Sequence, residues 1–568
     1  MGVKRWWRYG AAALAGVGWA LSFPKASLAG LAWLVPAAMV AIAAGRRAGE
    51  AFRLGYVAGL AQQLVGLSWL LNIPAQGYPI LGWIALSAFL ALFPAVWLRL
   101  TAVTCKEPGR PGRSDGWPGR TLWALSGAAA WVALEMVQAR ALGGFPWNLL
   151  GASQYALLPL IQMAAVTGVY GVSFVVAWTS LALFCAGRET LRRPTERYAW
   201  LGELLLPGLV IGALFAIGWQ RLQSAADGGR ELRVTVVQPS IPQTLIWDAR
   251  ENRNRFGQLI ELSQRALAEP TDLLVWPEAA VPEMVRHDPD TRRAVTDLAR
   301  ARGVWIILGS DDAALRPGGR SEADVEYYNA GFLINPEGNL VASYRKNHLV
   351  MFGEFVPLAR WWPMLRRLTP ISGEFTPGTK AVPFSLERRP SRAESLPPAT
   401  AAPEPPGPAA RVTAATVICF EDVFPHLVRR HVTADTDLLV NLTNDGWFGQ
   451  SAAQWQHAAS AAFRALENGV PLLRCCNNGL TCWVDARGRW RAVFRDAEGS
   501  EYGPGWATWR IALPEPARRS ATTFYNRHGD WLGWACVVAT LARVASRVVL
   551  RRRQKLERRN SPAQVSAA

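Results

Sequence analysis

Eight long apolar runs constrain the fold of this chain more than any other feature. Seven follow one another near the N-terminus and one lies near the C-terminus, at about residues 9–21, 28–44, 51–71, 79–98, 121–142, 156–186, 198–219 and 531–550. Most reach the roughly 20 residues that an α-helix needs to cross about 30 Å of hydrocarbon. Buried helices of a soluble protein are also apolar, but so many in succession predict a polytopic α-helical membrane bundle of about eight spans.

The composition is typical of a membrane protein. The 568 residues are 50% hydrophobic and only 18% charged, and they include 27 Trp. This length exceeds what one core accommodates and predicts two or three domains. A net charge of +18 would suggest a nucleic-acid partner in a soluble chain. The positions of the basic residues therefore decide what that charge means.

The basic residues cluster in alternate connections between the apolar runs. They occupy the N-terminus and every second connection, at Lys4, Arg5, Arg8, Arg46, Arg47, Arg53, Arg99, Lys106, Arg110, Arg113, Arg120, Arg188, Arg192, Arg193 and Arg197. The opposite connections hold only Lys25 and Arg140, and "RRRQKLERR" follows the last run. By the positive-inside rule both termini are cytoplasmic, and residues 220–528 lie outside the cytoplasm. We therefore expect a membrane-embedded protein without a nucleic-acid partner.

Domain limits follow from this topology. We expect a membrane domain with seven transmembrane helices over 1–220, an extracytoplasmic domain over 228–515, a further transmembrane helix over 529–550 and a cytoplasmic basic tail over 551–568. The first apolar run is short and is followed by "KASLAG" (25–30), so a cleaved signal peptide is an alternative to a first span. The topology of the remaining chain is the same in both cases.

The segment between the seventh and eighth runs has an α/β pattern. Strand-like runs occur at 232–238, 272–278, 304–310, 329–338, 415–421 and 437–445, with helical patterns between several of them, as at 255–268 and 291–302. This alternation predicts sheets layered with helices. Residues 387–410 are rich in Pro, Ala and charge, so we expect a disordered surface insertion there.

The cysteines do not predict a metal site. They stand at Cys105, Cys185, Cys419, Cys475, Cys476, Cys482 and Cys536, without the paired spacing of a zinc site or a disulfide framework. Cys419 closes the β-branched run "VICFED", and the carboxylates of Glu421 and Asp422 should raise the pKa of its thiol. A reactive Cys419 would therefore need help from residues distant in the sequence.

Three strand-end segments carry the candidate chemistry. "LLVWPEAA" ends an apolar strand at Glu278, "YRKNHLVMFGEFVP" contains Lys346 and Glu354, and "TVICFED" contains Cys419. Each has an ordinary interpretation: a cap or turn glutamate, a solvated basic turn and a core cysteine. Together they place an acid, a base and a thiol at strand ends, where α/β layers build sites.

At these segments the chain resembles the nitrilase, or carbon–nitrogen hydrolase, superfamily, and within it the apolipoprotein N-acyltransferases. The resemblance extends to "FPWNLLG" (145–151), "QPSIPQTLIWD" (238–248), "NLTNDGWFG" (441–449), "PLLRCCNNG" (471–479) and "TFYNRHGDW" (523–531). It implies a nitrilase-like αββα sandwich on the periplasmic side of a bacterial inner membrane. The insertion at 387–410 departs from the compact family pattern and should loop out at the surface.

The resemblance also implies a role for each matched residue. Glu278 corresponds to the general base, Lys346 to the triad lysine and Cys419 to the nucleophile. The supporting positions are two further acidic residues, a position that is often Tyr and an aromatic residue lining the site, which are here Glu354, Glu421, Phe420 and Trp247. The implied reaction is ping-pong transfer of an acyl chain from a phospholipid to the N-terminal amine of a diacylated lipoprotein. It needs no metal or cofactor, and we expect a monomer.

Physical chemistry is compatible with these roles. A free thiol is only a few per cent thiolate at pH 7. An ammonium at Lys346 favours the thiolate, and Glu278 can take the proton. Lys346 and the backbone N–H of Phe420 are candidates to hold the oxyanion. Glu421 is expected to orient Lys346 or to close a polar network, and no role follows for Asp422.

Several features have two interpretations. The apolar segment 350–365 suits a lipid-facing lid with Trp361 and Trp362 at the interface, or ordinary core packing. Glu135 and Arg140 lie near the outer end of the fifth run, where ionisable groups suggest function. Arg140 would then meet a phospholipid phosphate, and the alternative is an interhelical or interface charge. His348 and His457 are expected to be structural.

Two other functions remain open on the residues alone. A membrane-anchored amidase acting on a small soluble amide would share the triad but would not need a bundle of eight spans. A catalytically inactive membrane scaffold would not need the intact set of Glu278, Lys346 and Cys419.

Overall fold

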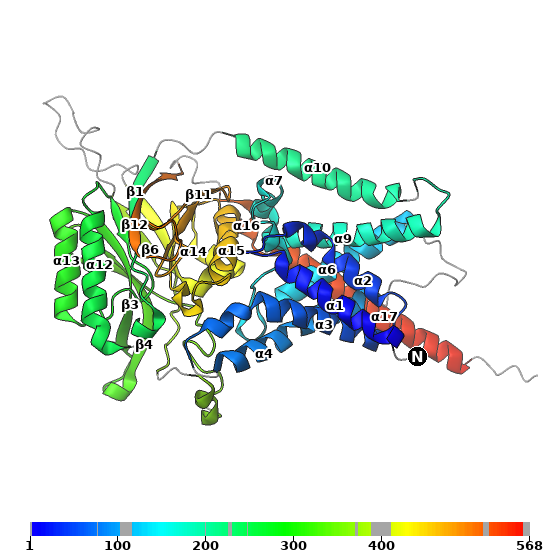
Figure 1. Ribbon diagram of the computed structural model, residues 1–568, viewed down its shortest axis with the longest axis horizontal. Coiled ribbons are helices and arrows are strands. Elements are labelled where there is room, and N and C mark those ends of the chain that lie inside the picture. Colours follow the sequence, from blue (N-terminus) through cyan, green and yellow to red (C-terminus); the bar gives the residue numbers. More distant parts are fainter. Residues whose placement is uncertain are drawn as a thin grey trace, which may run out of the picture.

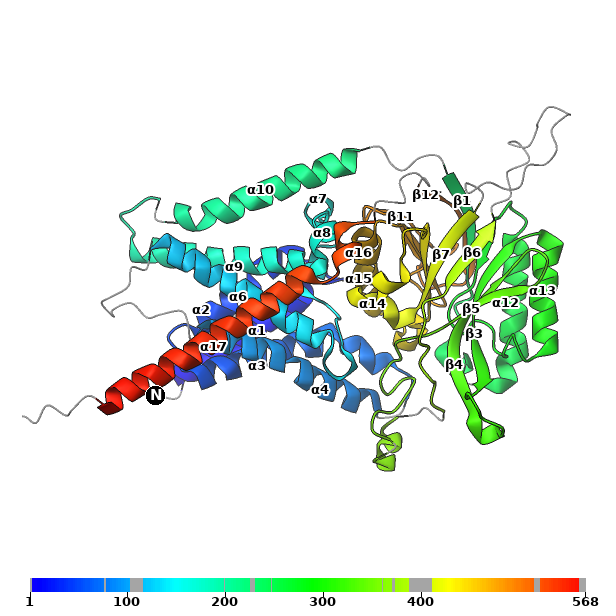
Figure 2. The same cartoon turned by 180° about the vertical axis from the view of Figure 1, so that it is seen from behind.

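A computed structural model describes residues 3–75, 78–102, 116–198, 200–224, 230–246, 248–359, 361–369, 373–387, 411–514 and 522–560. A helical bundle, blue, cyan and red in Figure 1, lies beside an α/β domain coloured green to brown. The C-terminal helix returns to the bundle after the α/β domain, and Figure 2 shows the same arrangement from behind.

The bundle is built from the apolar runs. Its helices are α1 (Val3–Leu21), α2 (Val35–Ala43), α3 (Ala48–Gly66), α4 (Tyr78–Leu90), α5 (Leu92–Ala102), α6 (Trp117–Gln138), α7 (Leu158–Ile161), α8 (Ala164–Thr167), α9 (Val169–Arg192), α10 (Leu201–Gln223) and α17 (Trp531–Asn560), with the 3-10 turns η1 (Ala29–Trp33), η2 (Ser68–Asn72), η3 (Ala141–Gly143) and η4 (Leu150–Gln154). Among the described residues, four stretches are long and apolar enough to cross a membrane: Tyr78–Ala102, Val169–Arg192, Leu201–Gln223 and Trp531–Gln554.

Small residues let the bundle helices approach closely. A Cβ built on Gly16 of α1 would lie 2.1 Å from the carbonyl oxygen of Ala58 in α3. A Cβ on Gly55 of α3 would lie 2.7 Å from the carbonyl oxygen of Pro94 in α5. Helices in a bilayer associate mainly through such close packing, because lipid is as apolar as their side chains.

Two predicted helices are shorter than expected. The run at 28–44 forms η1 and then α2, whose nine residues extend only about 14 Å. The run at 156–186 is divided into α7, α8 and α9, and Gly168 separates the last two with a φ of +66°. A Cβ at Gly168 would lie 2.6 Å from the ring of Tyr525, so the break admits an aromatic residue that follows the α/β domain.

The α/β domain contains two six-stranded sheets packed face to face. The first has the order β12-β1-β2-β3-β4-β5 and the second β11-β10-β9-β8-β7-β6. Their strands are β1 (Arg230–Gln238), β2 (Leu273–Val275), β3 (Trp305–Leu315), β4 (Val325–Ile334), β5 (Leu340–Arg345), β6 (Pro383–Glu387), β7 (Arg411–Ile418), β8 (Leu438–Thr443), β9 (Leu472–Cys476), β10 (Cys482–Val484), β11 (Trp490–Val493) and β12 (Gly505–Leu513). One apolar core, which includes Val234, Ile307 and Val440, fills the space between the sheets.

Helices cover both outer faces and complete the predicted αββα sandwich. A second core joins the first sheet to α12 (Asn252–Ala266) and α13 (Pro289–Arg302). A third joins the second sheet to α14 (Pro425–His431) and α15 (Ala453–Asn468). In both views α12 and α13 lie farthest from the bundle, whereas α14 and α15 lie next to it (Figures 1 and 2).

The predicted strands are present, but two of them, β2 and β7, end earlier than predicted at the candidate site. β2 ends at Val275, two residues before Pro277, which has no N–H to donate to a ladder. β7 ends at Ile418, because Cys419 has a φ of +52° and begins the 3-10 turn η9 (Cys419–Val423). The predicted insertion at 387–410 lies outside the described residues except for Glu387, which ends β6.

Candidate active site

The three predicted catalytic residues meet at the ends of strands from both sheets. Glu278 follows β2, Lys346 follows β5 directly and Cys419 follows β7 directly. Lys346 Nζ donates to Glu278 Oε1 over 3.1 Å, and the Lys346 side chain is only 1% exposed. Their charges act on Cys419, so the three groups form one cluster.

Lys346 is held by two carboxylates and stays charged. Its Nζ also donates to Glu354 Oε1 over 2.8 Å. Burial works against the charge of Lys346, but Glu278 and Glu354 outweigh it and raise its pKa well above the ordinary value. Asn329 Nδ2 donates to the same two carboxylate oxygens, each over 2.8 Å. Glu354 thus orients Lys346, and Asn329 joins Glu354 to Glu278.

Cys419 is a protonated thiol in a constrained backbone. Burial raises its pKa well above the ordinary value and Glu278 raises it further, whereas Lys346 lowers it. Its backbone N–H donates to Asn441 Oδ1 over 3.0 Å, and its carbonyl accepts from Asn441 Nδ2 over 3.1 Å. A non-glycine residue at φ +52° needs such support. The thiol therefore needs a base before it can attack.

Glu421 bonds the backbone next to Lys346 and lies in a network of hydrogen bonds. Its carboxylate accepts from Tyr344 Oη at 2.8 and 2.9 Å. It also accepts from three backbone N–H groups, those of Asn347, His348 and Ile418, at 2.7, 3.0 and 2.7 Å. Burial raises the pKa of Glu421 to about 7, although its hydrogen bonds favour the charged form. Glu421 thus ties the chain after Lys346 to the chain before Cys419, closing the expected polar network.

Asp422, which had no expected role, lies in a second buried network. It bonds Asn441 Nδ2 and Arg474, and its Oδ1 lies 2.8 Å from His457 Nε2. Asp445 Oδ1 lies 2.8 Å from His457 Nδ1, and Asp445 also pairs with Arg474 at 3.1 Å. Burial opposes the charge of His457, but the two aspartates raise its pKa to about 9. This network fixes the asparagine that holds Cys419, and His457 is structural as predicted.

Phe420 faces the bundle. Its ring lies 5.6 Å from Phe145 and 6.2 Å from Trp147, both in the connection after α6, and 5.1 Å from Phe424. With Trp69 and Phe448 these rings belong to one apolar cluster, which we call the aromatic junction. Phe420 directly follows Cys419, so the aromatic junction brings the bundle to within one residue of Cys419. Trp247, the predicted aromatic lining residue, lies outside the described residues.

Gln456 of α15 makes the polar part of the same contact. Its Oε1 accepts from Trp147 Nε1 at 2.8 Å, and from Trp69 Nε1 and Asn148 Nδ2 at 3.2 Å each. Its Nε2 donates to the carbonyl of Pro24 at 2.9 Å. Three separate connections of the bundle are therefore bound by one side chain, which is 3% exposed.

For Arg140 and Glu135 the contacts within the protein favour the structural interpretation over a role in function. Arg140 pairs with Asp530 and lies over the Trp534 ring at 5.3 Å, so it is an interface charge. Glu135 accepts from the backbone N–H of Leu150 at 2.7 Å and from Trp131 Nε1 at 3.0 Å. It ties α6 to η4.

Much of the apolar surface of the segment 350–365 is exposed, although Val356 and Ala359 are buried. Trp361 is 79% exposed and Trp362 is 67% exposed. Met364 and Leu358 are also exposed, while Glu354 in the same segment reaches Lys346. One segment thus carries both a site residue and an exposed apolar surface, as a lid requires.

Sequence reasoning missed three site residues. Asn329 and Asn441 bind Glu278 and Cys419 respectively, and Asn441 stands in the "NLTNDGWFG" segment that carried part of the resemblance. Asp311 lies opposite Asn329 in the β3–β4 pair. Burial and the charges of Glu278 and Glu354 raise the pKa of Asp311 to about 7. The register of the β3–β4 pair brings Asp311 and Asn329 together, and no short sequence motif indicates that register.

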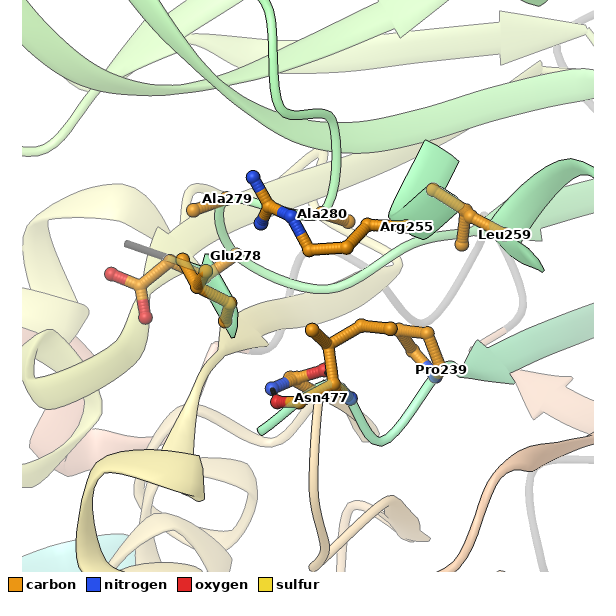
Figure 3. A pocket seen from close by; sticks show the side chains of 9 residues that line it. Pro239, Arg255, Leu259, Glu278, Ala279, Ala280 and Asn477 are labelled. Carbon is orange, nitrogen blue, oxygen red and sulfur yellow. Dashed lines mark hydrogen bonds between the residues drawn. The ribbon is translucent and has the colours of Figure 1, made fainter. Parts of the chain in front are cut away.

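A pocket lies beside Glu278. It is lined by Pro239, Ile241, Ile246, Arg255, Leu259, Glu278, Ala279, Ala280 and Asn477. Figure 3 shows Arg255 reaching from α12 towards Ala279 and Ala280, while the Glu278 carboxylate points away from the other labelled side chains. Glu278 thus lines the pocket, while its carboxylate is directed away from the other lining side chains and bonds Lys346.

This fold and cluster define a nitrilase-type domain carried by a helical membrane domain. The Carbon-nitrogen hydrolase family matches residues 233–498, and the Apolipoprotein N-acyltransferase N-terminal domain matches residues 15–182. The chain is 35% identical over 95% of its length to a protein from Geobacter metallireducens named apolipoprotein N-acyltransferase, of which 95% is covered. It therefore belongs to the apolipoprotein N-acyltransferase family, which confirms the resemblance.

Other relatives agree. Proteins of the same name from Brucella melitensis and Bradyrhizobium diazoefficiens are 29% and 30% identical over 94% and 81% of this chain, and 92% and 80% of their own lengths are covered. An amidase from Nesterenkonia with a solved structure is 16% identical, with a TM-score of 0.34 over 50% of this chain and 92% of its own.

Proposed function

We propose that this protein transfers a fatty acyl chain from a membrane phospholipid, through a thioester on Cys419, to the α-amino group of the N-terminal S-diacylglyceryl cysteine of lipoproteins. The observation that carries the proposal is the buried cluster of Lys346, Glu278 and Cys419, one residue from the aromatic junction with the bundle. An enzyme for soluble amides needs no such junction.

In the first half-reaction Glu278 takes the proton of Cys419 while sulfur attacks the ester carbonyl. Lys346 stabilises the thiolate and, with the backbone N–H of Phe420, the oxyanion, and each donor is typically worth about 3–4 kcal/mol. The carbon–oxygen bond then breaks, and Glu278 returns its proton to the leaving glycerol oxygen. The products are a thioester and a lysophospholipid, and no net proton is exchanged.

In the second half-reaction a free α-amine attacks the thioester carbonyl. The carbon–sulfur bond breaks, the amine proton passes to Glu278 and then to sulfur, and an amide leaves. Water would compete for the same thioester. The apolar rings of Phe420, Phe145 and Trp147 exclude water from the side of the site that faces the bundle.

The proposed setting is the inner membrane of a bacterium. About eight spans, both termini in the cytoplasm and the α/β domain in the periplasm satisfy the distribution of basic residues. The apolar helices and the contact of α15 with the bundle support a site at the membrane surface. Trp361 and Trp362 then lie at the interface as part of a lid.

One experiment tests the proposal. Purified protein is incubated with labelled phospholipid, and a hydroxylamine-sensitive acyl adduct is sought in wild type and in Cys419→Ala. We expect the adduct in wild type only, and we expect it to disappear when a diacylated lipopeptide is added. Hydrolysis of soluble amides without an adduct would support the amidase instead. Absence of both activities would support a scaffold.

A further inference from the structure

Arg255 is a buried cation beside the catalytic cluster. It is 7% exposed, and its guanidinium reaches across the pocket that Glu278 also lines (Figure 3). Nη2 donates to Asn252 Oδ1 at 2.6 Å. Nε is fully buried and makes no hydrogen bond with any described residue. Most donor groups of this guanidinium are therefore unused.

Arg255 also forms no ion pair within the described ranges. The carboxylates of Glu251 and Glu283 act on it electrostatically, but they bond Asn254 and Asn252 instead. Burial lowers the pKa of Arg255, which shows that removing it from water is costly. A buried charge that no carboxylate contacts directly leaves donor groups for which a ligand can supply the opposite charge.

Among the described residues that line the pocket, Arg255 is the side chain with hydrogen-bond donors still available. Across the pocket, Asn477 has already bonded the backbone of Ile241 in both directions, at 2.8 and 3.0 Å. The other lining residues, Glu278 apart, are apolar or small. A planar guanidinium with several free N–H groups is the side chain best suited to bind a phosphate through two parallel hydrogen bonds.

The position of the pocket fits one end of a phospholipid. The aromatic junction lies on the side of the domain that faces the bundle, and α12, which carries Arg255, lies on the far side (Figures 1 and 2). An ester at Cys419 would direct its acyl chain towards the bundle. The glycerol phosphate would then extend the other way, past Glu278.

We propose that the Arg255 pocket is an anion-binding subsite that holds the phosphate group of the phospholipid acyl donor. This inference rests on the proposed function. Arg255 is then the residue that distinguishes acyl donors with a phosphate group from neutral acyl donors. The head group beyond the phosphate contributes nothing to this contact.

The test compares two donors that differ only in phosphate. Formation of the hydroxylamine-sensitive adduct is measured with dipalmitoyl phosphatidic acid and with dipalmitoylglycerol. We expect wild type to react about 10- to 100-fold faster with the phospholipid, as for a lost hydrogen bond to a charged group. Arg255→Gln should lose this preference while its rate with dipalmitoylglycerol is unchanged. Arg255→Lys should keep part of it.

Arg253→Gln is the matched control, because Arg253 lies on the same helix and is exposed. It should behave as wild type with both donors. An Arg255→Gln enzyme that keeps the preference overturns the proposal. An equal loss with both donors, together with a lower melting temperature, means that Arg255 is structural and also overturns it.

Inorganic phosphate separates this inference from the proposed function. Millimolar phosphate should raise the melting temperature of wild type and not of Arg255→Gln. If wild type forms no adduct with either donor but shows this stabilisation, acyl transfer is wrong and only a free-anion site remains. If neither adduct nor stabilisation occurs, both proposals are wrong.

Discussion

At the scale of single residues, the site separates the groups that react from the groups that hold them. Lys346 is fixed by Glu278 and Glu354, and Cys419 is fixed through its backbone by Asn441. The carboxylates of Glu421 and Asp422, which follow the nucleophile, point into hydrogen-bond networks. The thiol has its pKa raised mainly by burial, so the proposed reaction requires Glu278 to remove its proton.

Removing the support of the Cys419 backbone should slow acylation. Asn441→Ala loses both bonds to Cys419 and leaves Asp422 without one of its partners. We expect the rate of adduct formation to fall about 10- to 100-fold, because each bond is worth roughly 1 kcal/mol and the backbone is strained. Asn468→Ala removes a buried asparagine of α15 away from the site and serves as the control. Equal rates in the two variants would contradict the role of Asn441.

The charge of His457 predicts a pH dependence of stability. Its pKa is about 9 in the folded protein, above the ordinary 6.5, because Asp422 and Asp445 face it. Protonated His457 therefore stabilises the fold fully below pH 6.5, and this contribution is lost as the pH rises through 9. The change is on the order of 3 kcal/mol. The melting temperature of wild type should fall over this range more steeply than that of His457→Gln, and parallel curves would contradict the assignment.

At the scale of elements, α15 joins the two parts of the molecule. Gln456 holds three connections of the bundle, and His457, the next residue, holds Asp422 near Cys419. One turn of α15 thus contacts the bundle through Gln456 and supports the loop that carries Cys419 through His457.

Loosening this contact should expose the thioester to water. Gln456→Leu leaves the donors of Trp69, Trp147 and Asn148 buried without their acceptor, at a cost of about 1–3 kcal/mol each. We expect faster loss of the acyl adduct in the absence of an amine acceptor. Asn72→Ala removes another bond between the two parts, to the carbonyl of Phe448, and is the control. Unchanged adduct lifetime in Gln456→Leu would show that Gln456 does not exclude water.

The segment 350–365 should open and close. The side chains of Trp361 and Trp362 are exposed, and their backbone N–H groups donate to the nearby carbonyl of Leu358. We expect fast hydrogen exchange in this segment in detergent and slower exchange in phospholipid vesicles, where the rings can enter the interface. Strong protection in both conditions would rule out a lid.

At the scale of the whole molecule, the α/β domain is attached at both ends to the bundle. α10 leads into β1, and α17 follows α16 (Phe524–His528) directly after the domain (Figure 1). The Tyr525 ring packs on Gly168 at the end of α8, so the return connection is itself part of the contact. Two attachments limit how far the site can move from the bundle.

The topology can be tested by labelling from outside. Ser391→Cys in the Pro-rich insertion should react with a membrane-impermeant thiol reagent in spheroplasts. Ser561→Cys in the tail should react only after the cells are permeabilised. Wild type is the control, since its described cysteines are free and mostly buried. Labelling of Ser561→Cys in intact spheroplasts would reverse the proposed orientation.

Much of this protein was determined by its sequence alone. Apolar runs predict membrane helices, because length and hydropathy are local properties. Alternation predicts sheets layered with helices, and Glu278, Lys346 and Cys419 stand in segments that can be recognised when they are taken together. Tertiary structure alone decided the roles of Asn329, Asn441 and Asp422. Their partners lie far away in the sequence, and a buried polar group acquires its function only from the groups that replace water around it.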